Sequence, residues 1–329
     1  MGVNTDSRHG SNKPTVSVII PTYGRNEHLP RALDSINNQT YSAIETIVVD
    51  DGSPRPVAET IDESTIADIE SIRFIRHNQN LGANVARNRG ISDSTGKYIA
   101  FLDDDDWWHH RKLEKQIEAF QTSSSDVGVV YTGKKSTRSS ESNVMTPTYE
   151  GNVIPYLIRG HNFGQFSSVM VQSTAIPKAG FPDERFPAWQ DREWFFRLAK
   201  HCHFAAVPEV LTYRRPGLPD SIGTKFQQQR DIAYPLFLRK HYPFVRSLGL
   251  VPARTFLASL RRTLGRTAIQ ANQHSAARKL FLSSFLSNPM YRKVYPDLVA
   301  SLGGKATYEA AARFQRAFRD RQLPISIRG

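Results

Sequence analysis

Short apolar segments alternate with stretches of helical periodicity along the first two thirds of the chain. The alternation predicts strands at residues 16–20, 44–49, 72–75, 97–102, 127–131 and 167–171, and helices at 29–36, 61–69, 83–91, 113–120 and from about 190 to 198. Strands that alternate with helices pair in parallel through right-handed crossovers, which covers both faces of the sheet. The pattern therefore predicts an α/β fold with a mainly parallel sheet.

Two stretches lack this alternation. Residues 133–150 are rich in Ser and Thr and have no periodicity, which predicts a mobile loop or an exposed hairpin. The last hundred residues carry only helical patterns, including helices near 291–302 and 307–319. We divide the chain into a disordered N-terminal tail (1–14), an α/β domain (15–224) and an all-α C-terminal extension (225–329).

Polar motifs follow three of the predicted strands at the same end. These motifs are Pro21-Thr22-Tyr23, Asp50-Asp51-Gly52-Ser53 and the run from Asp103 to Asp106. Because ligands of α/β sheets bind at the carboxyl ends of the strands, we expect a binding site there. Neither a dinucleotide-binding Gly-x-Gly-x-x-Gly motif nor a phosphate loop occurs at the matching positions, so the sequence argues against both kinds of nucleotide site.

The apolar segment at residues 97–102 ends on four consecutive carboxylates, Asp103 to Asp106. Carboxylates this close repel one another, and a bound cation relieves the repulsion. Oxygen ligands suit Mg²⁺ or Mn²⁺ better than zinc. If the strand continues, Asp103 and Asp105 point to one side and Asp104 and Asp106 to the other, so one pair can face a metal-bound diphosphate. The alternative is a solvated helix N-terminus, where such a carboxylate is also favoured.

The composition of the 329-residue chain indicates the cellular compartment in which the protein is expected. Its one cysteine, Cys202, excludes an intramolecular disulfide and fits a reducing environment. The polar segment 1–14 lacks the apolar core of a signal peptide, and no run of eighteen apolar residues occurs. We therefore expect a cytoplasmic protein, soluble or peripheral at the cytoplasmic face of the membrane.

The net charge of +12 is concentrated at the C-terminal end, which carries a balance of +14 from Arg239 onward. Such basic stretches bind nucleic acid, anionic lipid or an acidic partner. Five residues here fall near the offsets of a tetratricopeptide repeat: Leu264, Gly265, Ala277, Phe281 and Pro289. A lone repeat unit cannot bury its apolar face, so we expect it to pack on the α/β domain or on a second copy of the chain, as in a homo-oligomer.

Four ordered motifs resemble those of the inverting nucleotide-sugar glycosyltransferases of family 2, which have a GT-A fold. The motifs are residues 16–23, residues 48–53, Asn80-x-Gly82 with residues 86–90, and residues 96–106. Together they place the resemblance over about residues 15 to 215. It implies a GT-A sheet, a nucleotide-sugar donor with uridine diphosphate as the commonest carrier, and a divalent metal.

The resemblance also implies roles for individual residues. It places the nucleotide and its sugar against Pro21, Thr22, Tyr23, Asp51, Asn80, Arg87, Asp103 and Asp104, the metal ion on Asp105 and Asp103, and the catalytic base at Asp191. From the residues alone, Asp191 fits equally well as a carboxylate at a helix N-terminus without a catalytic role.

Two positions depart from the family pattern. The residue before the base is often Glu in the family and is Gln190 here, which removes one negative charge beside Asp191. The segment from Tyr213 to Gly217 resembles the loop that closes over the diphosphate, but it lacks the histidine often found there. We expect an arginine to make the phosphate contact instead.

The sequence therefore predicts single displacement of a sugar from its nucleoside diphosphate onto a hydroxyl of a glycan or lipid-linked acceptor. Family members often act on lipid-linked acceptors, so we expect the basic C-terminal module, including Arg313, Arg316 and Arg319, to dock on an anionic membrane surface. One alternative is a metal-dependent nucleotidyltransferase, which would form pyrophosphate. Another is a basic nucleic-acid- or membrane-binding protein. The chain has no helix-turn-helix signature and no basic strands interleaved with aromatic residues, so we expect no nucleic acid partner.

Overall fold

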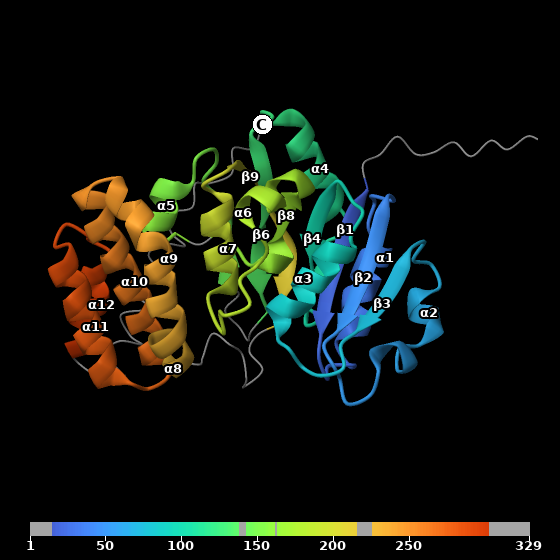
Figure 1. The fold of residues 1–329 in the computed structure, drawn as a ribbon, viewed down its shortest axis with the longest axis horizontal. Helices are drawn as coiled ribbons and strands as arrows, with labels where there is room; N and C mark the ends of the chain where they lie inside the picture. Colours follow the sequence, from blue (N-terminus) through green and yellow to red (C-terminus); the bar gives the residue numbers. More distant parts are fainter. Residues whose placement is uncertain (1–14, 138–142, 162, 216–225, 303–329) are drawn as a thin grey trace, which may run out of the picture. The chain divides into compact units, whose positions relative to one another are not determined.

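A computed structural model describes residues 15–137, 143–161, 163–215 and 226–302. The chain forms two compact units (Figure 1). The sheet unit comprises Met1–Val153, Phe163–Glu184 and Gln190–Pro216, and the helical unit comprises Ile154–Asn162, Arg185–Trp189 and Gly217–Gly329. Each unit thus contains segments that are separated in the sequence.

Within the described residues, the sheet unit is built on a mixed sheet of nine strands. The strands are β1 (Val16–Thr22), β2 (Ile44–Asp50), β3 (Ile72–Arg76), β4 (Tyr98–Phe101), β5 (Asp106–Trp108), β6 (Val127–Ser136), β7 (Asn143–Met145), β8 (Val169–Gln172) and β9 (His203–Arg214). Their order is β3-β2-β1-β4-β8-β6-β9-β5, and β7 pairs with β6. The first four strands are parallel, β8 runs antiparallel between β4 and β6, and β6 pairs in parallel with β9. The expected α/β fold with a mainly parallel sheet is confirmed.

Helices of the sheet unit lie between these strands in the chain. They are α1 (Leu29–Asn37), the short α2 (Glu63–Ile66), α3 (Ala83–Asp93), α4 (Lys112–Thr122), α6 (Ile176–Ala179) and α7 (Gln190–Leu198), with 3₁₀ turns at Val57–Glu59, Phe166–Ser168 and Ser173–Ala175. Leu33 of α1 and Leu113 of α4 belong to one buried core with Val18 of β1. On α7, Trp194 is fully buried and meets Phe101 of β4 edge to face, with ring centroids 5.5 Å apart. The aromatic residues of this helix, Trp194, Phe195 and Phe196, are all buried.

The predicted helix at residues 61–69 is wrong over most of its length. The side chain of Asp62 accepts the Ser64 N–H at 2.9 Å and caps α2, which ends at Ile66. Polar residues such as Ser64 and Thr65 compete for backbone hydrogen bonds and weaken a helix interior. Ile69 still packs against the core, so the spacing of the apolar residues correctly predicted their burial.

The Ser/Thr-rich stretch forms a hairpin of β6 and β7, in which Lys134 lies opposite Met145. This agrees with the hairpin alternative of the prediction. The segment 138–142 lies outside the described residues.

The helical unit contains α5 (Ile154–Ile158), α8 (Phe226–Gln228), a π-helical turn at Gln229–Ala233, α9 (Tyr234–Ser247), α10 (Leu250–Gln270), α11 (His274–Ser287) and α12 (Val294–Leu302). Helices α10 and α11 pack directly on each other (Figure 1). A Cβ on Gly265 would lie 2.6 Å from the ring of Phe281, so only glycine permits this close packing. Both residues belong to the tetratricopeptide-like pattern. The predicted helix at 307–319 lies outside the described residues.

Two short segments from earlier in the chain, Ile154–Asn162 and Arg185–Trp189, belong to the helical unit and contact its helices. The Ser259 hydroxyl donates to the carbonyl of Ile158 at 2.8 Å, and the Tyr291 hydroxyl donates to the carbonyl of Arg159 at 2.9 Å. The ring of Phe186 meets that of Phe237 edge to face. Among the helices that the structure describes, none is long and apolar enough to cross a bilayer.

Candidate active site

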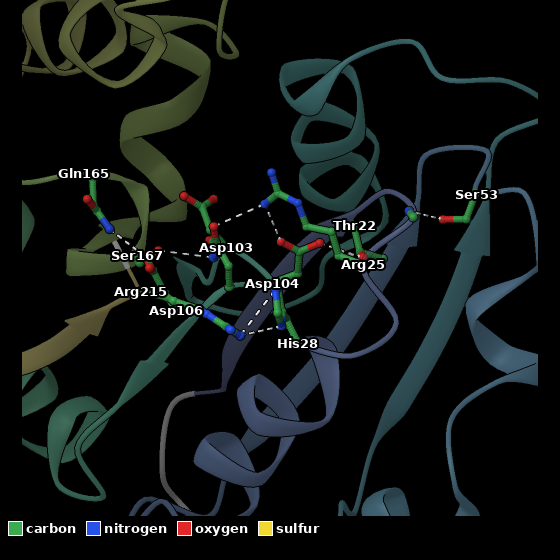
Figure 2. Close-up of polar contacts among 12 residues, drawn as sticks. Thr22, Arg25, His28, Ser53, Asp103, Asp104, Asp106, Gln165, Ser167 and Arg215 are labelled. Carbon is green, nitrogen blue, oxygen red and sulfur yellow. Dashed lines mark hydrogen bonds and ion pairs between the residues drawn. The ribbon is translucent and has the colours of Figure 1, made fainter. Parts of the chain in front are cut away.

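The four carboxylates occupy a tight turn between β4 and β5. Strand β4 ends at Phe101, and the Asp106 N–H donates to the Asp103 carbonyl at 2.9 Å to close the turn. The expectation that Asp103 to Asp106 alternate along a continuing strand is therefore wrong, because the chain reverses at once to begin β5. The carboxylates instead meet partners from several segments of the sheet unit (Figure 2).

Asp104 and Asp105 both pair with the guanidinium group of Arg25. The Thr22 hydroxyl donates to Asp104 at 2.8 Å, and Arg25 Nη1 contacts Asp104 at 3.1 Å and Asp105 at 3.2 Å. Both partners come from the end of β1 and the loop that follows it. Thr22, expected at the nucleotide-sugar, thus anchors the carboxylate turn.

The outer two carboxylates face other segments of the sheet unit. Arg87 Nη2 pairs with Asp103 at 2.7 Å, and the Ser167 hydroxyl accepts the Asp103 N–H at 3.1 Å. Gln165 Nε2 donates to Asp106 at 2.5 Å (Figure 2). The turn is therefore held by residues from β1, α3 and the segment before β8.

Burial raises the pKa values of three carboxyl groups in this turn. It raises the pKa of Asp104 to about 6, against the opposing effects of Arg25 and Thr22. Burial, followed by the charge of Asp103, also raises the pKa of Asp105. The same two causes, with Asp105 in addition, raise the pKa of Asp106 well above its ordinary value. A bound cation would favour the ionised form of all three groups.

The donor groups of the turn fit a hard divalent cation. The Oδ1 atom of Asp106 is buried and has no hydrogen-bond partner among the described residues. Over that same part of the chain, no three His, Cys, Asp or Glu side chains are arranged as a complete metal site. Mg²⁺ is typically bound by one or two carboxylates together with substrate phosphates. The turn suits such a shared site better than a metal held by protein alone.

The carboxylate of Asp51, at the end of β2, is occupied by backbone donors. It accepts the N–H groups of Leu81 at 3.0 Å and Gly82 at 2.7 Å, and it lies 2.8 Å from Nδ1 of His77. Asn80, on the same loop, is exposed and its side chain accepts the Gly82 N–H at 3.1 Å. Asp51 thus fixes the loop that carries Asn80.

The remaining residues expected at the nucleotide differ in exposure. Pro21 is buried within β1, whereas the Tyr23 side chain is 46% exposed just beyond the strand. An exposed aromatic ring beside a site edge can stack on a planar base. Tyr23 is therefore the better placed of the two for direct contact.

Arg87 connects three parts of the site. In addition to Asp103, it contacts Asn84 Oδ1 at 3.1 Å and Gln190 Oε1 at 3.3 Å, and its guanidinium lies 4.0 Å from the centre of the Phe166 ring. Gln190 is the first residue of α7. The arginine expected at the nucleotide thus joins the carboxylate turn to the start of the helix that carries Asp191.

Asp191 lies in the first turn of α7 and is partly buried. Its Oδ1 accepts the N–H of Arg192 at 2.7 Å. Its charge also acts on Lys134 of β6, whose pKa is further affected by Asp106 and Asp103. The predicted base and two carboxylates of the turn therefore act electrostatically on the same lysine.

The predicted phosphate loop is described only in part. Arg214 ends β9 opposite Asp106, and Arg215 Nη1 lies 2.8 Å from Nδ1 of His28 (Figure 2). Residues 216 and 217 of the loop lie outside the described residues.

Sequence reasoning missed four residues of this site: Arg25, Lys134, Gln165 and Ser167. Arg25 immediately follows the first polar motif, and its adjacency to that motif was a usable signal. The other three come from the hairpin strand and the segment before β8, where nothing in the local pattern indicates a site.

Comparisons with known proteins show which proteins this chain resembles. The family model described as glycosyl transferase family 2 matches residues 17–176. The amylovoran biosynthesis glycosyltransferase AmsB of Erwinia amylovora is 28% identical over 304 residues, which cover 88% of this chain and 98% of AmsB. An uncharacterized glycosyltransferase of Rickettsia bellii is 35% identical over 149 residues, but the match covers 44% of this chain and only 21% of that protein.

Two solved structures share the fold. The mannosyltransferase PcManGT of Pyrobaculum calidifontis, in complex with GDP-Man and Mn²⁺, aligns with a TM-score of 0.56 at 17% identity over 91% of this chain and 86% of its own. S. aureus TarS 1–349 in complex with UDP-GlcNAc aligns with a TM-score of 0.53 at 14% identity over 90% and 92%. The GT-A architecture is thereby confirmed, and residues 17–176 match the model of glycosyl transferase family 2.

Proposed function

We propose that this protein transfers a sugar from a nucleoside diphosphate, most simply UDP, to an acceptor hydroxyl in the assembly of a polysaccharide. The observation that carries the proposal is the connection, through Arg87, of the carboxylate turn to the helix that bears Asp191. Further support comes from the named role of AmsB in amylovoran biosynthesis and from the UDP-GlcNAc and GDP-Man bound by the two structural neighbours.

The proposed reaction is a single displacement with inversion. The acceptor oxygen forms a bond to the anomeric carbon, the bond from that carbon to the diphosphate oxygen breaks, and the acceptor proton passes to Asp191. A carboxylate is ionised at neutral pH and can accept this proton as the new bond forms. Helix α7 contributes by holding Asp191 at a fixed place, so that the acceptor hydroxyl is oriented before the reaction.

Asp105, together with Asp103, would hold the Mg²⁺ or Mn²⁺ ion. When bound, the ion would neutralise charge on the departing diphosphate. The chain itself places two arginines at the turn: Arg25 pairs with Asp104 and Asp105, and Arg87 pairs with Asp103. Tyr23, exposed at the end of β1, would stack against the nucleotide base.

The direct test is a panel of UDP- and GDP-sugars, assayed with Mn²⁺ or Mg²⁺ and again with chelator present. Release of nucleoside diphosphate that requires the metal supports the proposal. The proton spectrum of the product should show the anomeric configuration opposite to that of the donor. Formation of pyrophosphate would identify a nucleotidyltransferase instead, and a retained configuration would exclude the single displacement.

We also propose that the helical unit docks on an anionic membrane surface that carries the acceptor. Its helices α11 and α12 expose apolar side chains at Leu282, Leu286, Val299 and Leu302, and Met290 is exposed between them. Arg278, Lys279, Arg292 and Lys293 lie in the same stretch of chain. Apolar side chains that enter the interface and cations that attract anionic lipid favour the same orientation. Arg313, Arg316 and Arg319, which contribute to the charge argument, lie outside the described residues.

Liposome sedimentation tests this attachment. Binding to vesicles with anionic lipid should exceed binding to neutral vesicles, should weaken in high salt, and should fall after removal of residues 305–329, since each basic residue near the surface adds about 1 kcal/mol. Equal binding to both vesicle types would contradict the attachment and leave the helical unit with a structural role only.

A further inference from the structure

Lys134 lies inside the proposed site but has no role in the chemistry described above. It is the eighth residue of β6 and is partly buried. Its one hydrogen bond among the described residues runs from Nζ to Gln165 Oε1 at 3.3 Å. Within the same part of the chain, no carboxylate lies within ion-pair distance of this ammonium group. An ammonium carries three N–H donors, so most of its hydrogen-bonding capacity is left for a ligand.

The sheet positions this side chain through an irregularity between β6 and β9. The register shifts on both sides of Gly133, where β9 contributes extra residues. A Cβ on Gly133 would lie 2.6 Å from the Glu209 carbonyl oxygen, so the bulge requires glycine at this position. Bulges of this kind occur near active sites and re-aim side chains. Thr132 and Lys134, two residues apart, share the strand face that meets the segment 165–168.

A buried relay orients the lysine. Asp106 accepts the Gln165 amide N–H, which turns the amide oxygen of Gln165 toward Lys134. The Ser168 hydroxyl accepts the backbone N–H of Gln165 at 3.0 Å and donates to its carbonyl at 2.9 Å, which fixes the backbone that carries the amide. The Lys134 ammonium is therefore held from the side of the carboxylate turn.

Charges from both halves of the proposed reaction centre act on Lys134. Burial lowers its pKa most strongly, while Asp191, Asp106 and Asp103 act to raise it and Arg214 acts to lower it. Asp103 and Asp106 belong to the turn assigned to the diphosphate, and Asp191 is assigned to the acceptor. The transferred sugar must lie between these groups when the acceptor attacks.

We propose that Lys134 donates hydrogen bonds to hydroxyl groups of the transferred sugar and so determines which donor sugar is bound. This inference rests on the proposed function. Hydrogen bonds from a charged donor are stronger than neutral ones and require well-placed oxygen acceptors, which a hexose ring supplies. The diphosphate, in contrast, has Arg25, Arg87 and the metal-binding carboxylates near it.

The test compares binding of a nucleoside diphosphate with binding of its sugar conjugate. Calorimetry with Mn²⁺ would use UDP and UDP-GlcNAc, and GDP and GDP-mannose, on the wild type, Lys134→Met and Lys135→Met. Lys135 is the matched control because it is the next residue on β6 and alternation places it on the opposite strand face. Lys134→Met should weaken binding of the conjugate about tenfold or more, leave binding of the free diphosphate unchanged, and Lys135→Met should change neither.

Each other outcome has a defined meaning. Unchanged affinity for the conjugate in Lys134→Met would overturn the inference and leave the proposed function standing. Equal weakening for diphosphate and conjugate would give Lys134 a diphosphate or structural role and would also overturn it. A wild type that binds neither UDP nor GDP would overturn the proposed function and the inference together.

Discussion

Strands β2 and β4 both lead into aspartates at the same edge of the sheet, but the carboxylates at the two strand ends are used differently. At the end of β2, Asp50 accepts the N–H groups of Ser53 at 2.8 Å and Val57 at 3.2 Å and pairs with Arg76. Burial would raise its pKa, but these hydrogen bonds outweigh burial and lower it. At the end of β4, burial dominates and raises the pKa of Asp104 to about 6.

The difference lies in the supply of backbone donors. The loop after β2 turns its N–H groups toward Asp50, and the loop after β3 turns its N–H groups toward Asp51, so both carboxylates fix loop backbone. The turn after β4 offers its carboxylates mainly side-chain partners, which a ligand can displace. Carboxylates satisfied by backbone groups stabilise the fold, and carboxylates without such groups remain available for chemistry.

The largest effect is expected from Asp191→Asn. Loss of the base should lower kcat by about 10²- to 10⁴-fold, because proton transfer contributes that much to the transition state. Asn keeps an oxygen that can accept the Arg192 N–H, so the helix start should remain intact. Single-turnover kinetics would measure the rate and calorimetry the donor affinity, which should stay near that of the wild type. A change in kcat below tenfold would remove Asp191 from the role of base.

Asp105→Asn tests the turn after β4, whose carboxylates have mainly side-chain partners. It should weaken metal-dependent donor binding by about 100-fold, since one charge at the ion is worth several kcal/mol. The melting temperature of the ligand-free protein should not fall, because Asp105 is partly exposed and repelled by Asp103. Unchanged donor affinity in calorimetry with Mn²⁺ would show that Asp105 does not hold the ion.

Asp50→Ala tests the end of β2, where the carboxylate accepts backbone N–H groups. Removal of a buried carboxylate that pairs with Arg76 and accepts two N–H groups should lower the free energy of unfolding by about 3 to 4 kcal/mol. Urea denaturation would measure the loss. The comparison breaks down if this variant is as stable as the wild type while its turnover is abolished, because Asp50 would then act in the reaction.

The pH dependence of stability should also distinguish Asp104, whose pKa is raised, from Asp50, whose pKa is lowered. A raised pKa means that the folded chain binds the Asp104 proton more tightly than the unfolded chain, so this group destabilises the fold above about pH 6. The destabilisation is relieved as the pH falls from 6 toward 4. Wild type and Asp104→Asn should therefore be similar in stability at pH 4 and differ by at most about 3 kcal/mol at pH 7, with Asn the more stable. A difference that does not vary with pH would contradict the assignment.

The sequence predicted the fold well because its strands are buried on both faces and its motifs fall at strand ends. Val18, Leu33 and Trp194 all lie in the core that their spacing predicted. The geometry of the carboxylate turn was not predictable, because a strand pattern does not show that the chain reverses after Phe101.

The remaining site residues depend on distant pairings. Lys134 reaches the site because of the register shift beside Gly133, and this shift is a property of the β6 and β9 pair rather than of either segment. Gln165 is placed by Asp106, which is 59 positions earlier in the sequence. Local periodicity carries no information about such contacts.

The helical unit draws two short segments, Ile154–Asn162 and Arg185–Trp189, from within the stretch that otherwise builds the sheet unit. Recombination at a single junction near residue 216 would therefore deliver an incomplete module, without the partners of Ser259, Tyr291 and Phe237. A descendant that acquired a different C-terminal module would have to exchange three separate stretches together. The family model ends at residue 176, so one of the two inserted segments falls inside the matched domain and the other beyond it. An exchange of the helical unit would therefore have to preserve the contacts that these two segments make within it.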